Sequence, residues 1–297
     1  MVFVLLATLF FQPPQPTPQL PPGHPVVSSS SYVPQRVFDT RQKAFSDFES
    51  MLADLARADA VFVGEQHDDP NTHRLELAVV EGLTRRGVSV VVALEMFERD
   101  VQAQVEGYAA GRSTEEQFLK DSRPWPRYAT DYRPLIEFAK THHLPVVASN
   151  VPRRIASDVS KNGMPAIDKL GADRPFAARE IQCPTSGDYY QRFGEAMGGH
   201  DGANANFYYA QCMKDETMGE SVADAFQKNS TGRVTIVHVN GAFHSDFGEG
   251  TAESARRRMP GRRIAVVTMI PVDDLDITKP DDDDFKRADY LVYTIGK

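Results

Sequence analysis

Short apolar runs alternate with longer segments of helical period from about residue 40 onward, and this alternation restricts the possible folds more than any other feature. Most of the apolar runs are hydrophobic on consecutive positions, which is typical of strands that helices cover on both faces. We predict strands at 59–64, 88–95, 144–149, 233–240, 264–270 and 290–295. The sequence therefore predicts an α/β fold whose mainly parallel β-sheet is flanked by helices.

The stretch 151–230 interrupts this alternation, because it contains long helical patterns and no convincing strand. We predict that it forms a smaller inserted helical domain and that 37–150 and 231–297 together form the α/β core domain. Inside the core, Pro70 opens an amphipathic helical pattern and Gly87 follows its basic last turn, which are the usual limits of a helix.

The first 36 residues are predicted to lie outside the folded core. Residues 2–11 are apolar and uncharged, about half the length of the roughly 20 residues that a spanning helix needs, and they resemble the core of a secretory signal. The proline-rich and serine-rich segment that follows predicts a disordered linker. We expect an exported protein of the periplasm or cell envelope, and the lack of a cysteine near the apolar run argues against a lipid anchor.

Charge and cysteine content narrow the function. The chain contains 33 Lys and Arg residues and 41 Asp and Glu residues, which gives a net charge of -8, and no segment concentrates basic residues. Because binding to a phosphate backbone depends on clustered cations, we do not expect nucleic acid as a partner. The two cysteines, Cys183 and Cys212, form a disulfide in an oxidising compartment or remain two buried thiols.

Polar residues gather where the predicted strands end. Glu65 and His67 follow the first strand, Glu95 ends the second, Asn150 follows the third, and His244 lies just beyond the fourth. Since ligands of open α/β sheets bind beyond the carboxyl ends of the strands, we expect these five side chains to share one rim.

Both histidines close a G-x-x-H segment that directly follows an apolar strand. Glycine allows the chain to turn sharply there, so that the histidine can return over the sheet edge. Each histidine alone could equally be a loop residue bonded to the backbone. Glu95 ends a buried apolar run and needs a partner, which could also be Arg153 or Arg154 in a salt bridge.

A helical pattern in the predicted insertion brings three further side chains to one face. Gln211, Asp215 and Met218 have the spacing i, i+4, i+7. A face that combines a carboxylate with a thioether indicates a helix that looks onto the crevice, although an exposed helix with a chance methionine has the same pattern.

With these residues in place, the chain resembles the ChaN-like haem-binding family of iron-regulated bacterial envelope proteins, many of them lipoproteins. The resemblance runs from about residue 37 to the end and rests on segments 61–73, 94–99, 125–126, 132–134, 144–153, 211–218 and 239–246. It implies a parallel sheet with a smaller helical domain, haem bound through a tyrosinate ligand, a homodimer enclosing two haems, and a role in haem or iron uptake, with an outer-membrane haem or iron receptor as a further partner.

Tyrosinate is a hard anionic ligand that favours ferric haem. The resemblance does not identify the ligand by a local motif. We take Tyr208 and Tyr209 as candidates, with Tyr108, Tyr189 and Tyr190 as competitors. The other candidate residues around the haem are Asn150, Arg153, Asp215 and Met218.

An enzyme is the alternative, because the paired G-x-x-H segments also resemble the wider superfamily of Tiki peptidases and erythromycin esterases. Under that interpretation Glu65, His67, Glu95 and His244 hold a divalent Zn, Mn or Co ion that activates water in a hydrolase, or a carboxylate acts as general base. A purely structural protein with a vestigial crevice is a third possibility, and it predicts that Glu95→Gln stabilises the fold.

Overall fold

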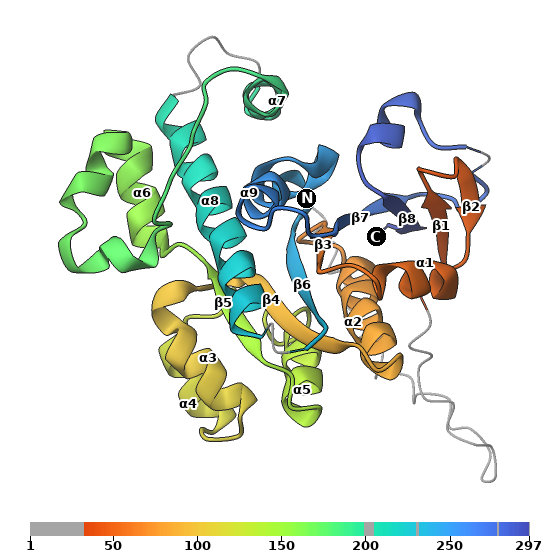
Figure 1. Ribbon diagram of the computed structural model, residues 1–297, viewed down its shortest axis with the longest axis horizontal. Coiled ribbons are helices and arrows are strands. Elements are labelled where there is room, and N and C mark those ends of the chain that lie inside the picture. The colour runs from red at the N-terminus through yellow and green to blue at the C-terminus, as the bar shows by residue number, and fades with distance from the viewer. Residues whose placement is uncertain (1–32, 199–204, 230–231, 278, 297) are drawn as a thin grey trace, which may run out of the picture. The chain divides into compact units, whose positions relative to one another are not determined.

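The core of the molecule is an eight-stranded sheet with the strand order β2-β1-β8-β7-β3-β6-β4-β5 (Figure 1). The computed structural model describes residues 33–198, 205–229, 232–277 and 279–296. Every neighbouring pair from β8 to β5 is parallel, whereas β1 and β2 add an antiparallel edge. The strands are β1 Gln35–Asp39, β2 Ala44–Ser46, β3 Ala60–Glu65, β4 Ser89–Glu98, β5 Val146–Asn150, β6 Val234–Gly241, β7 Ile264–Val272 and β8 Tyr290–Ile295.

All six predicted strands are present, so the predicted α/β class with a mainly parallel sheet is confirmed. The two antiparallel strands were not predicted. β1 begins at Gln35, inside the segment that we had assigned to the linker, and its neighbour β2 has only three residues. The signal-like run and the rest of the proline-rich segment lie outside the described residues.

Helices cover both faces of the sheet, which explains the continuous apolar strands. In β3, Val61 and Val63 belong to one core with α1, α2 and α5, whereas Ala60 and Phe62 belong to a second core with α8 and α9 (Figure 1). The α-helices are α1 Phe48–Leu55, α2 Pro70–Arg85, α3 Gln102–Ala109, α4 Glu115–Ser122, α5 Arg133–Thr141, α6 Arg153–Asn162, α7 Asp188–Ala196, α8 Ala205–Lys228 and α9 Gly250–Arg258.

The limits of α2 follow from its sequence. The Asp69 side chain accepts a hydrogen bond from the Asn71 backbone N–H at 2.8 Å and so caps the helix, with Pro70 in the first turn. Gly87, with φ of +73°, lies just beyond the last turn in the left-handed conformation that glycine tolerates. The predicted start and end of this helix are confirmed.

Residues 151–230 contribute α6, α7 and α8, and no strand occurs in the described part of this stretch. Helix α8 packs against α9, α6 and β5, so it joins the sheet to the other two helices (Figure 1). That 151–230 forms a domain distinct from 37–150 and 231–297 stays a proposal.

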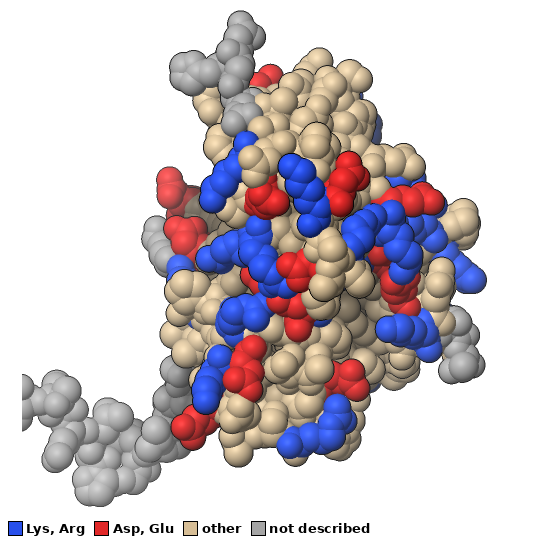
Figure 2. Space-filling model, turned by 90° about the vertical axis from the view of Figure 1, so that its left-hand side faces the viewer, with Lys and Arg blue, Asp and Glu red and all other residues tan. Residues whose placement is uncertain are grey.

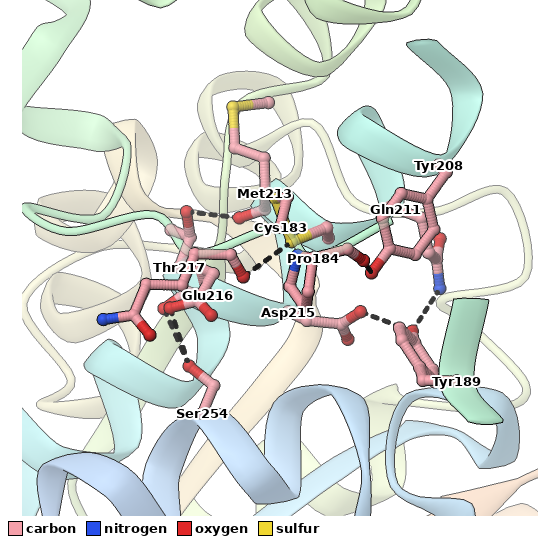
Figure 3. Close-up of a disulfide and its surroundings, with 12 residues drawn as sticks. Cys183, Pro184, Tyr189, Tyr208, Gln211, Met213, Asp215, Glu216, Thr217 and Ser254 are labelled. Atoms are coloured by element: carbon pink, nitrogen blue, oxygen red, sulfur yellow. Dashed lines mark hydrogen bonds between the residues drawn. A yellow bond between two sulfur atoms is a disulfide. The ribbon is translucent and has the colours of Figure 1, made fainter. Parts of the chain in front are cut away.

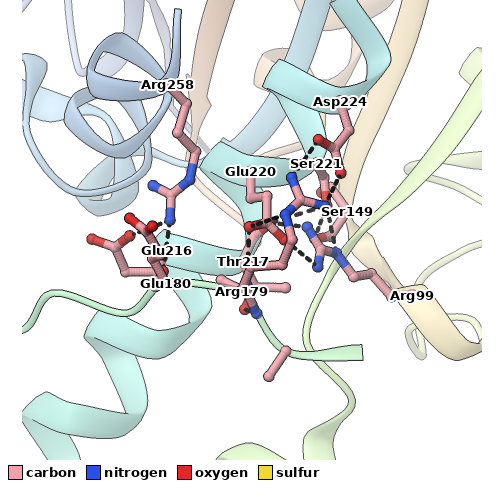
Figure 4. A network of polar contacts seen from close by, with 12 residues as sticks. Arg99, Ser149, Arg179, Glu180, Glu216, Thr217, Glu220, Ser221, Asp224 and Arg258 are labelled. Carbon is pink, nitrogen blue, oxygen red and sulfur yellow. Dashed lines mark hydrogen bonds and ion pairs between the residues drawn. The ribbon is translucent and has the colours of Figure 1, made fainter. Parts of the chain in front are cut away.

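A buried polar network fastens α8 to the end of β4 (Figure 4). The Arg99 guanidinium donates to Ser221 Oγ at 2.8 Å and to the Thr217 carbonyl at 2.8 Å, and it pairs with Glu220 at 3.0 Å. The other Glu220 oxygen accepts from the Arg179 backbone N–H at 2.9 Å. Because both partners of each contact are largely shielded from water, these charge-assisted bonds hold α8 in one position over the sheet.

Cys183 and Cys212 form a disulfide, which ties the segment before α7 to α8 (Figure 3). The sequence had left this pairing open.

Ionised residues of both signs are interspersed on the face seen from the side of α3, α4 and α6 (Figure 2). In the described part of the chain, none of the helices combines the length and apolar character needed to span a membrane.

Candidate functional site

Glu95 lies at the centre of the carboxyl rim of the sheet. One of its carboxylate oxygens, Oε2, accepts a hydrogen bond from the Gly241 backbone N–H at 2.8 Å, and the other, Oε1, is 3.2 Å from His244 Nε2. Asn150 Nδ2 donates to the Glu95 carbonyl at 3.1 Å and so links the ends of β4 and β5. Burial alone would raise the pKa of Glu95, but the charge and hydrogen bond of His244, together with the His67 charge and the Gly241 N–H, outweigh it and lower the pKa to about 2.

His244 is buried between two carboxylates. Its Nδ1 is 2.6 Å from Asp215 Oδ1 on α8, and its Nε2 faces Glu95. Thr251 Oγ1 donates to the same Asp215 oxygen at 2.8 Å, and Gln211 also contacts the ring. Burial by itself would lower the pKa of His244, but the charges of Glu95 and Asp215 raise it to about 10. The imidazole is therefore a cation at neutral pH, with both nitrogens committed to carboxylates.

His67 reaches the rim from the opposite side. Its Nδ1 is hydrogen-bonded to Glu65, and its ring lies edge-on to Trp125 with 5.0 Å between ring centres. A Cβ on Gly241 would come within 2.8 Å of His67 Nε2 and within 3.7 Å of Glu95 Oε2. Only glycine therefore allows the His67 ring to approach the backbone beside Glu95. The His67 side chain is 48% exposed, which makes it the accessible imidazole of the pair.

The two G-x-x-H turns thus meet at one rim beside Glu95, as the strand-end pattern predicted. The register explains why, since Glu65 pairs with Gly241 in the sheet and β4 runs beside β6. The salt-bridge alternative for Glu95 is wrong: Arg154 pairs instead with Asp100 and Asp173. Arg153 is exposed and makes no ion pair with the described residues.

The candidate residues of the insertion form two groups, the three side chains predicted to share one helix face and the two adjacent tyrosines. Gln211 and Asp215 reach His244, and Met218 is fully buried, so the face of α8 looks inward. Tyr208 is also buried and donates to the Pro184 carbonyl at 2.7 Å (Figure 3). Burial raises the pKa of Tyr208 to about 12. Tyr209 is half-buried, and its phenol makes no hydrogen bond with the described residues.

A second polar cluster lies beneath the rim, and we did not predict it from the sequence. It contains His73 and Glu76 of α2, together with Asp131 and Tyr132 before α5. Tyr132 donates to Glu65 Oε1 at 2.9 Å, and His73 Nδ1 is 2.9 Å from Glu65 Oε2. The available signal was a histidine and a glutamate three residues apart on the buried face of a predicted helix.

Burial and the hydrogen bonds within this cluster together set its protonation. Burial raises the pKa of Glu76 well above its usual value, helped by the negative charge of Glu65. Burial would lower the pKa of His73, but hydrogen bonds to Glu65 and Glu76 raise it to about 10. Glu65 is held ionised, because bonds from its neighbours lower its pKa despite burial.

These shifts predict a pH dependence of stability. His73 and His244, whose pKa rises from 6.5 to about 10, stabilise the fold below pH 6.5, and this contribution is lost as the pH rises toward 10. His238 is buried as the neutral form with a pKa of about 4, so stability falls as the pH drops from 6.5 toward 4. Glu95, whose pKa falls from 4.5 to about 2, also contributes stability that is lost as the pH drops through this range. Urea unfolding should therefore give maximal stability near pH 6.5, whereas a steady increase up to pH 10 would contradict the assignment.

A separate cavity of about 1130 Å³ runs along the edge strand β5. Apolar side chains such as Leu144 and Phe176 share its lining with Arg99, Arg174 and Arg179. None of the predicted site residues lines it. The strand ends place the candidate site at the rim instead, because the titratable groups converge there.

The fold and the rim define an α/β protein with a carboxylate and imidazole site at the strand ends. The chain belongs to the family described as haem-binding uptake, Tiki superfamily, ChaN, whose model matches residues 51–254, more than half of the sequence. No curated protein matches.

Solved structures resemble this chain at low sequence identity. ChaN of Campylobacter jejuni, described with cofacial haem binding, is 15% identical with a TM-score of 0.65, over 89% of this chain and 97% of that one. A Bacillus cereus protein is 11% identical with a TM-score of 0.46, over 82% and 90% of the two chains. A variant of the erythromycin esterase EreC is 13% identical with a TM-score of 0.45, over 89% and 83%.

Proposed function

We propose that this protein binds ferric haem through a tyrosinate beside the rim and takes part in haem or iron uptake in the cell envelope. Membership of the haem-binding uptake family supports the class of ligand. The observation that carries the proposal is a half-buried tyrosine, Tyr209, whose phenol has no hydrogen-bond partner in the described part of the chain and which lies in an aromatic cluster next to the rim.

The aromatic cluster supplies the apolar wall that a porphyrin needs. The side chains that pack together there come from α7, from α8 and from the turn that carries His244, namely Tyr189, Tyr190, Phe193, Tyr208, Tyr209 and Phe243. Phe243 is the residue before His244, so the wall adjoins the rim directly. Tyr189 points toward Asp215 and Gln211 (Figure 3).

The packing favours Tyr209 as the axial ligand. Tyr208 would have to leave its bond to the Pro184 carbonyl, and Tyr189 already donates to Asp215. Burial raises the pKa of Tyr189 well above 10, and the Asp215 charge adds to that, so its tyrosinate form is disfavoured. Tyr190 makes a ring contact with Tyr208 and no hydrogen bond within the described ranges, so it is the second candidate.

The other candidate residues take supporting roles in this proposal. Arg153 begins α6 directly after the end of β5, and its guanidinium, which makes no ion pair with the described residues, suits a haem propionate. Asn150 and Asp215 position Glu95 and His244, and Met218 forms part of the buried surface behind them.

We also propose export and self-association. The disulfide supports an oxidising compartment. Met197 and Phe207 are exposed apolar side chains of the helical stretch, 47% and 45% exposed, and they suit contact with a second copy or with an outer-membrane receptor.

A haem titration tests the ligand assignment. Ferric haem added to the full chain should give a saturable Soret band and a tyrosinate-to-iron charge-transfer band. Tyr209→Phe should remove the charge-transfer band and weaken binding at least about tenfold, a loss of about 1.4 kcal/mol. Tyr208→Phe is the matched control and should retain both. No saturable binding by the unmodified chain would contradict haem binding, and an unchanged spectrum in Tyr209→Phe would contradict this ligand.

The metal-dependent hydrolase stays the alternative, with Glu65, His67, Glu95 and His244 as its residues and Zn, Mn or Co as its ion. The geometry does not favour it. A protonated His244 between Glu95 and Asp215 has no lone pair to offer a metal or a proton. One of the two carboxylate contacts would first have to be released.

A further inference from the structure

We propose that Glu65, His73 and Glu76 form a buried site for a divalent transition-metal ion, beneath the rim and separate from the haem site. The three side chains come from the end of β3 and from one face of α2. One ligand atom from each lies within 4.8 Å of the other two. Two carboxylates and an imidazole are ligands that Zn²⁺ and neighbouring first-row ions accept.

The distances suit a metal between the three groups. His73 Nδ1 is 2.9 Å from Glu65 Oε2 and 3.4 Å from Glu76 Oε1. Ligand bonds of about 2.0–2.2 Å in a tetrahedral shell place the ligand atoms about 3.4 Å apart. Small movements of the side chains would therefore create the coordination geometry without rearranging the backbone.

Two buried glutamate oxygens of this cluster are poorly satisfied by the residues that the structure describes. Glu76 Oε1 accepts no hydrogen bond from them, and Glu65 Oε2 has only the His73 ring beside it, at 2.9 Å. Glu65 and Glu76 are each 1% exposed, so neither oxygen is hydrated at the surface. Since buried polar atoms are almost always satisfied, these oxygens point to a bound group, and a cation would satisfy both glutamates at once.

The surroundings have the organisation of a metal site. The second nitrogen of His73, Nε2, is 3.4 Å from Asp131 Oδ2 and 3.2 Å from the His67 carbonyl. Arg127 in turn holds Asp131 at 2.6 Å. A carboxylate or carbonyl on the far nitrogen of a histidine fixes the ring, and a metal on the near nitrogen would displace the proton that His73 shares with Glu65 in the metal-free chain. Tyr132 fixes the remaining oxygen of Glu65.

The site is closed, because all three ligand residues are buried. Three protein ligands leave one tetrahedral position, and at so buried a place only water or a neighbouring side chain could fill it, not a substrate. We therefore infer a structural ion that joins α2 to the end of β3. Glu65 would then connect the two sites, with Oε2 on the metal and Oε1 toward His67 at the rim.

Zinc titration of the haem-free full chain tests this site. After prolonged treatment with a chelator, calorimetry with Zn²⁺ should show one ion per chain, and Co²⁺ should give the absorption of a tetrahedral complex. Glu76→Gln keeps the size of the side chain and removes an anionic ligand, so we expect its affinity for Zn²⁺ to fall at least about tenfold. Asp131→Asn should weaken binding about 10–100-fold through the histidine.

One control makes the result specific. Glu81→Gln changes an exposed glutamate of the same helix and should bind Zn²⁺ as the unmodified chain does. Zn²⁺ should raise the melting temperature of the unmodified chain and of Glu81→Gln but not of Glu76→Gln. Absence of saturable binding would overturn the proposal, and so would binding that Glu76→Gln leaves unchanged.

Discussion

His244→Ala is expected to lower the free energy of unfolding by about 3–5 kcal/mol, because it leaves Glu95 and Asp215 as buried charges without their common cation. Both carboxylates are at most 4% exposed, and each contacts a nitrogen of this one ring. Water cannot replace the imidazolium at so closed a position.

Urea unfolding at pH 6.5 measures this loss. The exposed Arg153 makes no ion pair with the described residues, so Arg153→Ala should change the stability by less than about 0.5 kcal/mol. Glu95→Gln should also destabilise, since it removes the partner of His244. A vestigial crevice predicts the reverse, so a more stable Glu95→Gln variant would contradict our description of the rim.

Removal of the disulfide is the second large effect. Cys183 and Cys212 are 29 residues apart in the sequence. In the chain-entropy model, a disulfide that closes a loop of this size stabilises the fold by about 3–4 kcal/mol, because it lowers the entropy of the unfolded chain. The Cys183→Ser, Cys212→Ser variant should lose about that amount in urea unfolding.

A reductant provides the matched comparison for this prediction. It should destabilise the unmodified chain to the level of the double variant and leave the variant itself unchanged. Equal stability of the oxidised chain and the variant would show that the bond does not restrain the unfolded state.

The sheet and the rim could be predicted from the sequence because both depend on local patterns. Consecutive apolar residues mark strands such as β3 and β6, and the parallel topology then brings their ends together. Gly64 and Gly241 also have a local signal, the turn that returns each histidine to the sheet edge. The edge strands β1 and β2 could not be predicted, because they are short and β2 is mostly exposed.

The partners of each charged group depend on packing that the sequence does not show. Glu95 meets His244 and not Arg153 or Arg154, since β6 and α8 close over it. Likewise, the two adjacent residues Tyr208 and Tyr209 have the same side chain. Only the structure shows that Tyr208 donates a hydrogen bond, while the Tyr209 phenol makes none with the residues described. The buried pair of His73 and Glu76 resembles an ordinary helical i, i+3 pair until Glu65 is placed beside it.

The position of iron in crystals of the haem complex tests the central claim most directly. Anomalous scattering at the iron edge should place the metal at bonding distance from the Tyr209 phenol oxygen, beside the aromatic cluster and the turn that carries His244. Iron in the cavity along β5, or iron coordinated by His67 at the rim, would contradict the account.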